Sequence, residues 1–503
     1  MTFPLNTSID RRRFLTLSGS TALASGLVGT GAATIASPVH AASHEWTLEI
    51  TRPSDTVYQY NGKTTGPIIS ASAGETIVVN LINAMPPIDD VCPADGNMNQ
   101  EHGANVTNLH THGLHVSPVR SDNDQYDSDN VFLRVVPDGQ IVGCGDPSNI
   151  RHGQNTFHFD LPSDHPPGTH WYHAHVHGST ARQVTGGLAG PLIIRDPDGW
   201  MPGYIAEAPE RVFMISNGTA IEVETDGGGQ SGNPIQLAPG AVERWRIINA
   251  EPRASSFVKI ASTSSDVELW QIAYDGLTLD SRVMLTDEDE GEPWNSPGIL
   301  APGNRMDVMV RVLETAPTGP LALTAEKAPA QFLHVEDNLA LADETVEIKI
   351  EVGGAADPKP WDAGDDLPGP MLKPITDVPV RTRDVHFEIG SNGFAINDQV
   401  FGEDPDPLFE MELDTVEEWE LTNGNSGMHP FHIHVNPFYV THINGEELGN
   451  DSPLRRWQDV IAIPGNGSIK FLTRFLDYKG KFVIHCHILA HEDRGMMRVV
   501  EVI

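Results

Sequence analysis

A strand-like segment occurs three times in this chain of 503 residues, starting at Gly74, Gly240 and Asp414, so that the copies lie 166 and 174 residues apart. Each copy alternates apolar and polar residues, is rich in β-branched or aromatic side chains, and ends in Asn. Alternation with a period of two residues predicts a strand. The interval accommodates one β-sandwich with its loops. The repeat therefore predicts an all-β chain of three β-sandwich domains.

The predicted domain boundaries follow from two segments rich in Gly, Pro and Asp, 196–199 and 353–369, which we interpret as linkers. We expect domains at 44–196, 204–352 and 375–503. The composition agrees with this class, because 39% hydrophobic residues together with 47 Gly and 38 Pro are typical of a soluble, loop-rich β protein.

The chain is strongly acidic, with 69 acidic against 32 basic residues and a net charge of -37. This charge excludes a general nucleic-acid binder, since too few cations are available to neutralise phosphates. An ordinary solvated surface, a salty habitat, or attraction of metal cations and cationic substrates would each account for the acidity. Composition does not separate these three interpretations.

The first 41 residues have the pattern of an export signal. The segment Asp10-Arg11-Arg12-Arg13-Phe14-Leu15 precedes a Gly-rich, mildly apolar run to about Ile35, and Val39-His40-Ala41 offers a cleavage site. This pattern resembles a twin-arginine signal, so we expect a signal peptide at 1–41 and a mature protein that is periplasmic or secreted. The run is too rich in Gly and Ser for a stable membrane anchor, and no later run is long enough to span a bilayer.

Two of the three cysteines, Cys92 and Cys144, lie in loop-like sequence of the N-terminal region. In an oxidising compartment they can form a disulfide, which we favour over two separate buried thiols.

The third cysteine lies in the segment His485-Cys486-His487, which is followed by His491 and Met496. One thiolate, two imidazoles and a weak thioether are the ligands of a blue-copper site. In a strand, residues i and i+2 share a face and residue i+1 faces the other way. His485 and His487 are therefore predicted to face a second metal site behind Cys486.

Further His-x-His pairs support a second site. The segment Trp171–His175 aligns with Val483–His487, with Ala174 at the position of Cys486, so the first domain cannot build a blue-copper site of its own. The middle domain has no such pair and is predicted to be a structural spacer. The clustered histidines are His110 and His112; His173 and His175; His429, His432 and His434; and His485, His487 and His491.

These four motifs resemble those of the three-domain multicopper oxidases, the family of bacterial laccases and cuprous oxidases, across essentially the whole mature chain. The resemblance implies three cupredoxin-like Greek-key β-sandwich domains that pack into a closed ring. It also implies four copper ions: one type 1 copper, and a trinuclear cluster of one type 2 and two type 3 coppers between the first and third domains.

The resemblance assigns each copper a set of ligands. His429, Cys486 and His491 would hold the type 1 copper, with Met496 as the axial ligand. His110 and His432 would hold the type 2 copper. His112, His173 and His487 would hold one type 3 copper, and His175, His434 and His485 the other.

The chain departs from the family pattern at Thr111, where the first motif more often has Trp. Residue 111 is not a ligand, so the change concerns packing around the metal. Three further histidines, His115, His170 and His177, lie near the motifs and are interpreted as non-ligands.

The resemblance implies that a small reducing substrate and O2 are the partners, with four one-electron oxidations coupled to reduction of O2 to water. Because the 13 Met form no dense cluster, we favour laccase-like oxidation of phenols or aromatic amines over oxidation of Cu(I), Fe(II) or Mn(II). A copper-free cupredoxin scaffold of the cell envelope is a further alternative, although no ligand is missing. A copper nitrite reductase with the same fold is another alternative, but it would need type 1 and type 2 coppers without a type 3 pair. The His-x-His pairs in both terminal domains argue against it. We expect a monomer.

Reduction of O2 to water consumes four protons, so carboxylates are expected near the cluster. Glu492 directly follows His491, in a segment that resembles the proton-relay position of the family. Asp129 is the second candidate, and Asp122, in a similar Ser-Asp-Asn triplet, competes with it.

Overall fold

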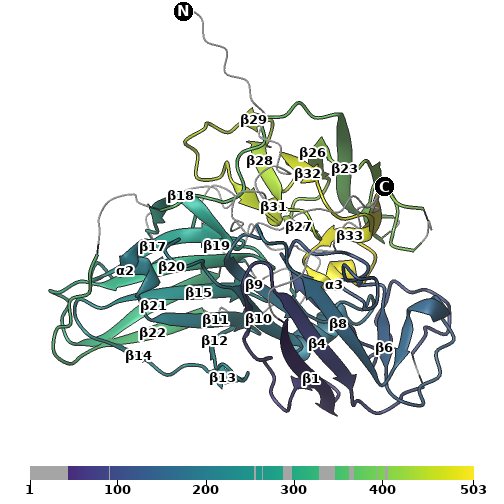
Figure 1. The fold of residues 1–503 in the computed structure, drawn as a ribbon, viewed down its shortest axis with the longest axis horizontal. Helices are drawn as coiled ribbons and strands as arrows, with labels where there is room; N and C mark the ends of the chain where they lie inside the picture. Colours follow the sequence, from purple (N-terminus) through teal and green to yellow (C-terminus); the bar gives the residue numbers. More distant parts are fainter. Residues whose placement is uncertain are drawn as a thin grey trace, which may run out of the picture. The chain divides into compact units, whose positions relative to one another are not determined.

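The computed structural model describes residues 43–503, except residues 90, 254–256, 263, 287–296, 328–345, 362–366, 392 and 403–405. The predicted signal peptide at 1–41 lies outside the described residues. The structure is dominated by strands (Figure 1). Its three α-helices within the described part are short: α1 (Thr180–Gly186), α2 (Gly203–Ala206) and α3 (Leu489–Glu492).

The first two sheets are formed by the segment 43–194. One has the strand order β2-β1-β4-β8, and the other has the order β3-β10-β9-β5. The strands of the first are β2 (Val57–Tyr60), β1 (Ser43–Ser54), β4 (Thr76–Asn83) and β8 (Gln154–Asp160). Those of the second are β3 (Ile69–Ala71), β10 (Ala189–Ile194), β9 (Gly168–His173) and β5 (His110–His112). A short two-stranded sheet pairs β6 (Arg134–Val136) with β7 (Ile150–His152).

The next two sheets are formed by the segment 210–352. The seven-stranded sheet contains β13 (Gly229–Gln230), β12 (Thr219–Val223), β11 (Glu210–Ser216), β15 (Val242–Asn249), β20 (Arg305–Val312), β17 (Val267–Tyr274) and β18 (Leu277–Met284), in that order. The five-stranded sheet contains β14 (Ile235–Leu237), β22 (Val346–Val352), β21 (Gly319–Lys327), β16 (Val258–Ser262) and β19 (Ile299–Leu300).

The last two sheets are formed by the segment 381–502. The seven-stranded sheet contains β24 (Gly393–Ile396), β23 (Arg381–Gly390), β26 (Thr415–Asn423), β32 (Ser468–Phe475), β28 (Phe438–Ile443) and β29 (Glu446–Glu447), with β30 (Trp457–Gln458) paired to β28. The five-stranded sheet contains β25 (Glu410–Met411), β34 (Met497–Val502), β33 (Gly480–Cys486), β27 (His429–Ile433) and β31 (Val460–Ile463).

Each pair of sheets encloses its own apolar core. The three largest clusters of buried apolar side chains draw their members from 48–194, from 213–352 and from 385–502, respectively. Separate cores are the physical mark of separate domains, so they support the predicted division of the chain; the exact boundaries at 44–196, 204–352 and 375–503 remain predictions.

The three repeated segments form equivalent strands, β4, β15 and β26. Each pairs in parallel with an earlier strand and antiparallel with a later one: β4 with β1 and β8, β15 with β11 and β20, and β26 with β23 and β32. The Asn that ends each copy is buried, and its side-chain oxygen accepts a hydrogen bond from the backbone N–H two residues on. An Asn in this turn replaces a backbone partner at the strand end, which explains why the same residue ends all three copies.

Cys92 and Cys144 form a disulfide, as predicted. The bond ties the loop between β4 and β5 to the loop between β6 and β7. No helix in the described part of the chain is long and apolar enough to cross a membrane.

Candidate metal centre

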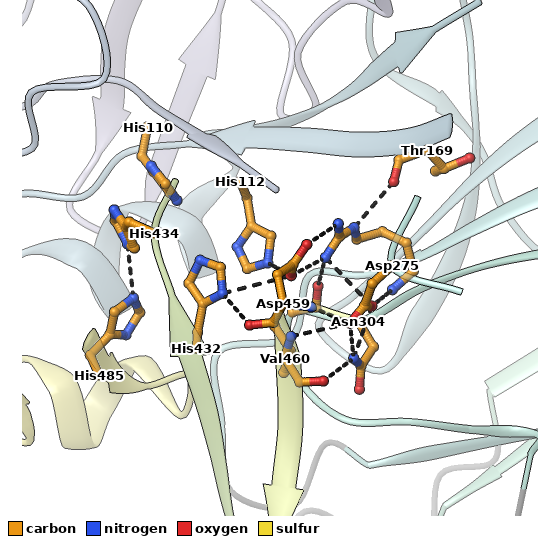
Figure 2. Close-up of polar contacts among 12 residues, drawn as sticks. His110, His112, Thr169, Asp275, Asn304, His432, His434, Asp459, Val460 and His485 are labelled. Carbon is orange, nitrogen blue, oxygen red and sulfur yellow. Dashed lines mark hydrogen bonds and ion pairs between the residues drawn. The ribbon is translucent and has the colours of Figure 1, made fainter. Parts of the chain in front are cut away.

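Two pairs of neighbouring strands, together with the segments that follow β9, β27 and β33, carry the predicted metal ligands. β5 pairs with β9, so that His110 lies opposite His173. β27 pairs with β33, so that His432 lies opposite His485. The two pairs belong to different sheets far apart in the chain, yet their histidines meet (Figure 2).

The contact between the strand pairs consists of stacked imidazole rings. His110 stacks on His434 and His112 on His432, with ring centroids 3.8 Å apart in each case. All members of this histidine cluster are at most 2% exposed. The cluster consists of His110, His112, His173, His175, His432, His434, His485 and His487.

Burial sets the protonation state of the cluster. It lowers the pKa of every one of these imidazoles, to about 3 for His173 and about 4 for His485. The cause is loss of hydration, which penalises the charged imidazolium, and neighbouring rings act in the same direction. The rings are therefore neutral, which is the form that binds a metal.

The hydrogen bonds of the cluster show which ring nitrogens are available. Nδ1 of His173 donates to the carbonyl of Ala174 at 2.9 Å, and Nδ1 of His432 donates to the carbonyl of Asp459 at 2.9 Å. Nδ1 of His110 contacts Asp129 at 2.9 Å. The Nε2 atoms of these three rings are buried and have no hydrogen-bond partner. A buried polar atom without a partner is costly, whereas an imidazole fixed through its other nitrogen is the usual arrangement of a metal-bound histidine. The residues therefore fit a metal cluster.

Three further nitrogens converge on one point. Nε2 of His485 lies 3.2 Å from Nε2 of His175 and 3.2 Å from Nε2 of His434. Nδ1 of His485 donates to the carbonyl of Cys486, so its Nε2 carries a lone pair directed at the other two rings. This separation suits ligands about 2 Å from a shared ion. These three residues are the set predicted for one type 3 copper.

The second group, here called the cysteine group, consists of His429, Cys486 and His491. The Cys486 sulfur lies 3.5 Å from Nδ1 of His429 and 3.7 Å from Nδ1 of His491. All three residues are at most 1% exposed. Met496 is fully buried beside them, where its carbonyl accepts from the backbone N–H of Cys486 and its own N–H donates to the carbonyl of His491, each at 3.0 Å.

Asp129, a predicted relay residue, lies against the cluster. Its carboxylate contacts Nδ1 of His110 and accepts hydrogen bonds from both the backbone N–H and the hydroxyl of Thr111, at 2.8 and 3.1 Å. Burial raises the pKa of Asp129 to about 7, and the Thr111 bonds act against that rise. Thr111, which stands where the family pattern more often has Trp, therefore supplies a hydroxyl to the carboxylate of Asp129. The competing candidate Asp122 is exposed.

Glu492, the other relay candidate, is buried on α3. Its Oε1 accepts from the hydroxyl of Thr180 at 3.2 Å and lies 3.7 Å from Nδ1 of His175. Burial raises the pKa of Glu492 well above its usual range, and the neighbouring Asp493 adds to the rise. Burial therefore favours the protonated form of Glu492, which lies within reach of the cluster.

The non-ligand histidines contact other partners. Nδ1 of His115 donates to the carbonyl of Val435 at 2.8 Å, and Nε2 of His177 bonds Asn99 at 2.9 Å. His170 is buried 5.7 Å from the ring of His165.

An ion-pair network that no sequence motif predicts lies on the other side of the cluster (Figure 2). Oδ1 of Asp459 lies 3.2 Å from Nε2 of His112. Its two carboxylate oxygens each accept from the guanidinium of Arg305 at 2.6 Å. Burial raises the pKa of Asp459 to about 7, but the two short bonds to Arg305 favour the ionised form.

Asp275 completes the network. It accepts from the side chain of Asn304 and from the backbone N–H groups of Asp459 and Val460. Asp275 and Arg305 come from the middle segment, which sequence analysis treats as a spacer. No motif marks these residues, because their partners lie 154 to 185 residues away in the chain.

Fold and site together define a β-sandwich protein with a buried histidine cluster joined through one strand to a cysteine group. Two family models described as multicopper oxidase match residues 138–199 and 374–503. The multicopper oxidase mco of Staphylococcus haemolyticus is 25% identical over 464 residues, covering 88% of this chain and 83% of that protein. The laccase of Bacillus stratosphericus is 25% identical over 497 residues, covering 90% of this chain and 91% of that protein.

Solved structures agree with these relatives. A laccase from Pediococcus acidilactici superposes with a TM-score of 0.63 at 21% identity, covering 92% of this chain and 90% of that one. A multicopper oxidase from Campylobacter jejuni, described as a metallo-oxidase, superposes with a TM-score of 0.63 at 20% identity, covering 92% of this chain and 91% of that one. This chain thus contains two segments that match multicopper oxidase family models, and it is similar over most of its length to proteins named multicopper oxidase or laccase. It is a copper-dependent oxidoreductase that uses O2 as electron acceptor, and the predicted fold of cupredoxin-like β-sandwiches is confirmed.

Proposed function

We propose that this enzyme is laccase-like and couples one-electron oxidation of phenols or aromatic amines to reduction of O2 to water. The observation that carries the proposal is the position of Cys486. Its side chain belongs to the cysteine group, while His485 and His487 on either side belong to the histidine cluster. One strand end thus connects an electron-accepting site to a multinuclear one.

We propose four bound copper ions with the ligands assigned by family resemblance. Two sets of side chains close enough to share an ion match this assignment: His429 with Cys486 and His491, and His175 with His434 and His485. A third set brings the two type 2 ligands, His110 and His432, together with His434. The buried, unpartnered nitrogens of His112, His173 and His487 support a further ion.

Copper, when bound, supplies the one-electron steps and the reduction of O2. The chain supplies the electron path from the cysteine group to the histidine cluster. Cys486 and His485 are covalently linked neighbours, and the carbonyl of Cys486 also accepts a hydrogen bond from Nδ1 of His485 at 3.1 Å. Asp129 orients His110, and Glu492 holds a proton near His175. Four electrons and four protons convert one O2 into two water molecules.

Metal-ion oxidation is the second candidate. The net charge of -37 attracts cations, and a structural neighbour is described as a metallo-oxidase. Phenols are favoured because the 13 Met form no dense cluster in the sequence and because the Phe394 ring lies 4.7 Å from that of His491.

Export by the twin-arginine route, into the periplasm or the medium, is part of the proposal. The arginine run at 11–13 and the Cys92–Cys144 disulfide both support it, because disulfides persist in oxidising compartments.

The test combines metal analysis with a comparison of substrates. Purified protein should contain about four coppers per chain and absorb as a blue-copper protein, and Cys486→Ser should lose the blue band. Steady-state rates on a phenol, Cu(I), Fe(II) and Mn(II) are then measured side by side. A higher rate on the phenol is expected; a higher rate on a metal ion would favour the metallo-oxidase, and protein that takes up no copper would support the scaffold alternative.

A further inference from the structure

A pocket of about 860 Å³ opens beside both metal groups. Most of its wall is apolar, with Phe132, Val176, Phe401 and Met497 among the side chains that line it. A volume of this size suits a small organic molecule. Its walls come from the loops around β6 and α1 and from the sheet that contains β33 and β34.

Two arginines line this apolar pocket, which we call the arginine pocket. The side chain of Arg134 is about nine-tenths buried; its guanidinium donates to the carbonyl of Cys144 at 3.1 Å and lies 3.4 Å from Nε2 of His102. Arg494 lies with its guanidinium carbon 5.3 Å from the centroid of the Phe394 ring. Neither arginine has a carboxylate within 4 Å among the residues that the structure describes.

A buried guanidinium with no carboxylate near it in the described part of the chain is unusual for a protein with 69 acidic and 32 basic residues. Burial lowers the pKa of Arg134, and no acidic neighbour opposes that shift. The carboxylate in the described lining, Asp146, accepts the backbone N–H of Ser148. Burying a cation without an anion is costly, so the pocket provides a positive site that a ligand carboxylate would neutralise.

The pocket also lies next to the redox groups. Phe394 belongs to its lining and its ring lies 4.7 Å from that of His491, while His175 of the histidine cluster lines another part. An aromatic molecule against Phe394 would be separated from His491 by one ring.

We propose that the arginine pocket binds a phenolic carboxylate as the reducing substrate, with the aromatic ring among the apolar side chains and the carboxylate paired with Arg134 and Arg494. Guanidinium and carboxylate form short, paired hydrogen bonds. Each phenol gives up one electron and one proton to become a phenoxyl radical, so that four phenols and one O2 yield four radicals and two water molecules. This assignment of substrate class rests on the proposed oxidase function.

The test is a binding measurement without turnover. Calorimetric titration of the whole protein under anaerobic conditions compares 4-hydroxy-3,5-dimethoxybenzoate with its methyl ester, which has the same ring without the charge. The carboxylate should bind at least about tenfold more tightly than the ester, the weaker end of the range for hydrogen bonds to charged groups. Arg134→Gln and Arg494→Gln should each reduce this ratio, whereas Arg381→Gln, at an exposed position outside the pocket, should leave it unchanged.

Equal binding of acid and ester by the unaltered protein would overturn the proposal. So would an unreduced ratio in Arg494→Gln, a substitution of an exposed residue that decides the matter even if Arg134→Gln does not fold. Oxygen uptake with the ester is measured separately. Absence of uptake with every reductant would refute the oxidase function, while the calorimetric ratio would still decide what the pocket binds.

Discussion

Cys486 is the residue on which both metal groups depend. Its sulfur contacts His429 and His491, and its carbonyl accepts from His485. Strand alternation alone predicts that its two neighbours face away from it, and the structure places them in the histidine cluster.

Met496 permits a test of the proposed axial role. Because a thioether donates weakly to copper, Met496→Leu should raise the reduction potential of the type 1 site while the blue absorption, which depends on Cys486, persists. Redox titration of the blue band measures the effect. Met497→Leu, also a buried methionine, is the matched control for altered packing. A potential identical to that of the unaltered protein would remove Met496 from the axial position.

Glu492 is expected to deliver protons. Since burial raises its pKa, the protonated form of Glu492 is favoured, and turnover should fall as pH rises through that pKa. Glu492→Gln should slow turnover by about 10²-fold and abolish this limb of the pH profile. The anaerobic rate of bleaching of the blue band should not change, because it reports electron entry.

Glu417→Gln, which alters a buried glutamate paired with Arg383, controls for loss of a buried carboxylate. An unchanged turnover and pH profile in Glu492→Gln would refute the relay role.

The ligand-type residues could be predicted from sequence because their spacing is short and their side-chain chemistry is specific. Asp275, Arg305 and Asp459 could not, since each is an ordinary charged residue whose role arises only when distant segments meet. The contact of Thr111 with Asp129 was not predicted either, although the sequence marks Thr111 as a departure from the family pattern and Asp129 as a relay candidate.

At the level of elements, two strand pairs carry the cluster and other elements hold them in place. α3 bears Glu492 and is followed by Asp493, whose carboxylate accepts from the backbone N–H groups of Gly178, Thr180 and Ala181 at the start of α1. This contact joins the last segment of the chain to the first. Helices this short have no periodic signal, so sequence patterns could not predict them.

β20 supports the cluster through Arg305, at its first residue. Arg305→Met should leave Asp459 as a buried charge without its partner, which costs about 3–5 kcal/mol, and should loosen His112 and His432. Arg305→Lys keeps the charge but loses the paired geometry, so an intermediate effect is expected. Two quantities are measured: the copper retained after dialysis against a chelator, and the free energy of unfolding of the copper-free protein.

Arg211→Met is the control for this network, because Arg211 pairs with Glu243 and Glu222 in a more exposed ion pair. If Arg305→Met retained copper and stability as well as Arg211→Met does, the network would have no positioning role.

At the level of the whole molecule, the three parts of the chain meet in shared contacts. One apolar cluster combines Trp171, Val212, Ile248 and Leu489, which come from all three parts. The repeat in the sequence predicted the sandwiches, but it held no information on their mutual packing. The arginine pocket was likewise hidden, because its walls come from segments far apart in the chain.

The net charge of -37 gives a prediction for the entire surface. Mutual repulsion of the acidic groups should destabilise the folded state, and 1 M salt reduces the screening length to about 3 Å. The melting temperature should therefore rise as NaCl increases from low concentration to 1 M, and equally with KCl. A melting temperature that stays constant or falls would show that the acidic residues are already balanced by their local partners.

The stoichiometry of oxygen consumption shows whether the cysteine group and the histidine cluster work as one oxidase site. A site that joins the cysteine group to a multinuclear cluster should consume one O2 for every four equivalents of a one-electron reductant and release no hydrogen peroxide. An oxygen electrode combined with a peroxide assay measures both quantities. One O2 for every two equivalents, with peroxide accumulating, would show that the two metal groups do not reduce O2 to water together.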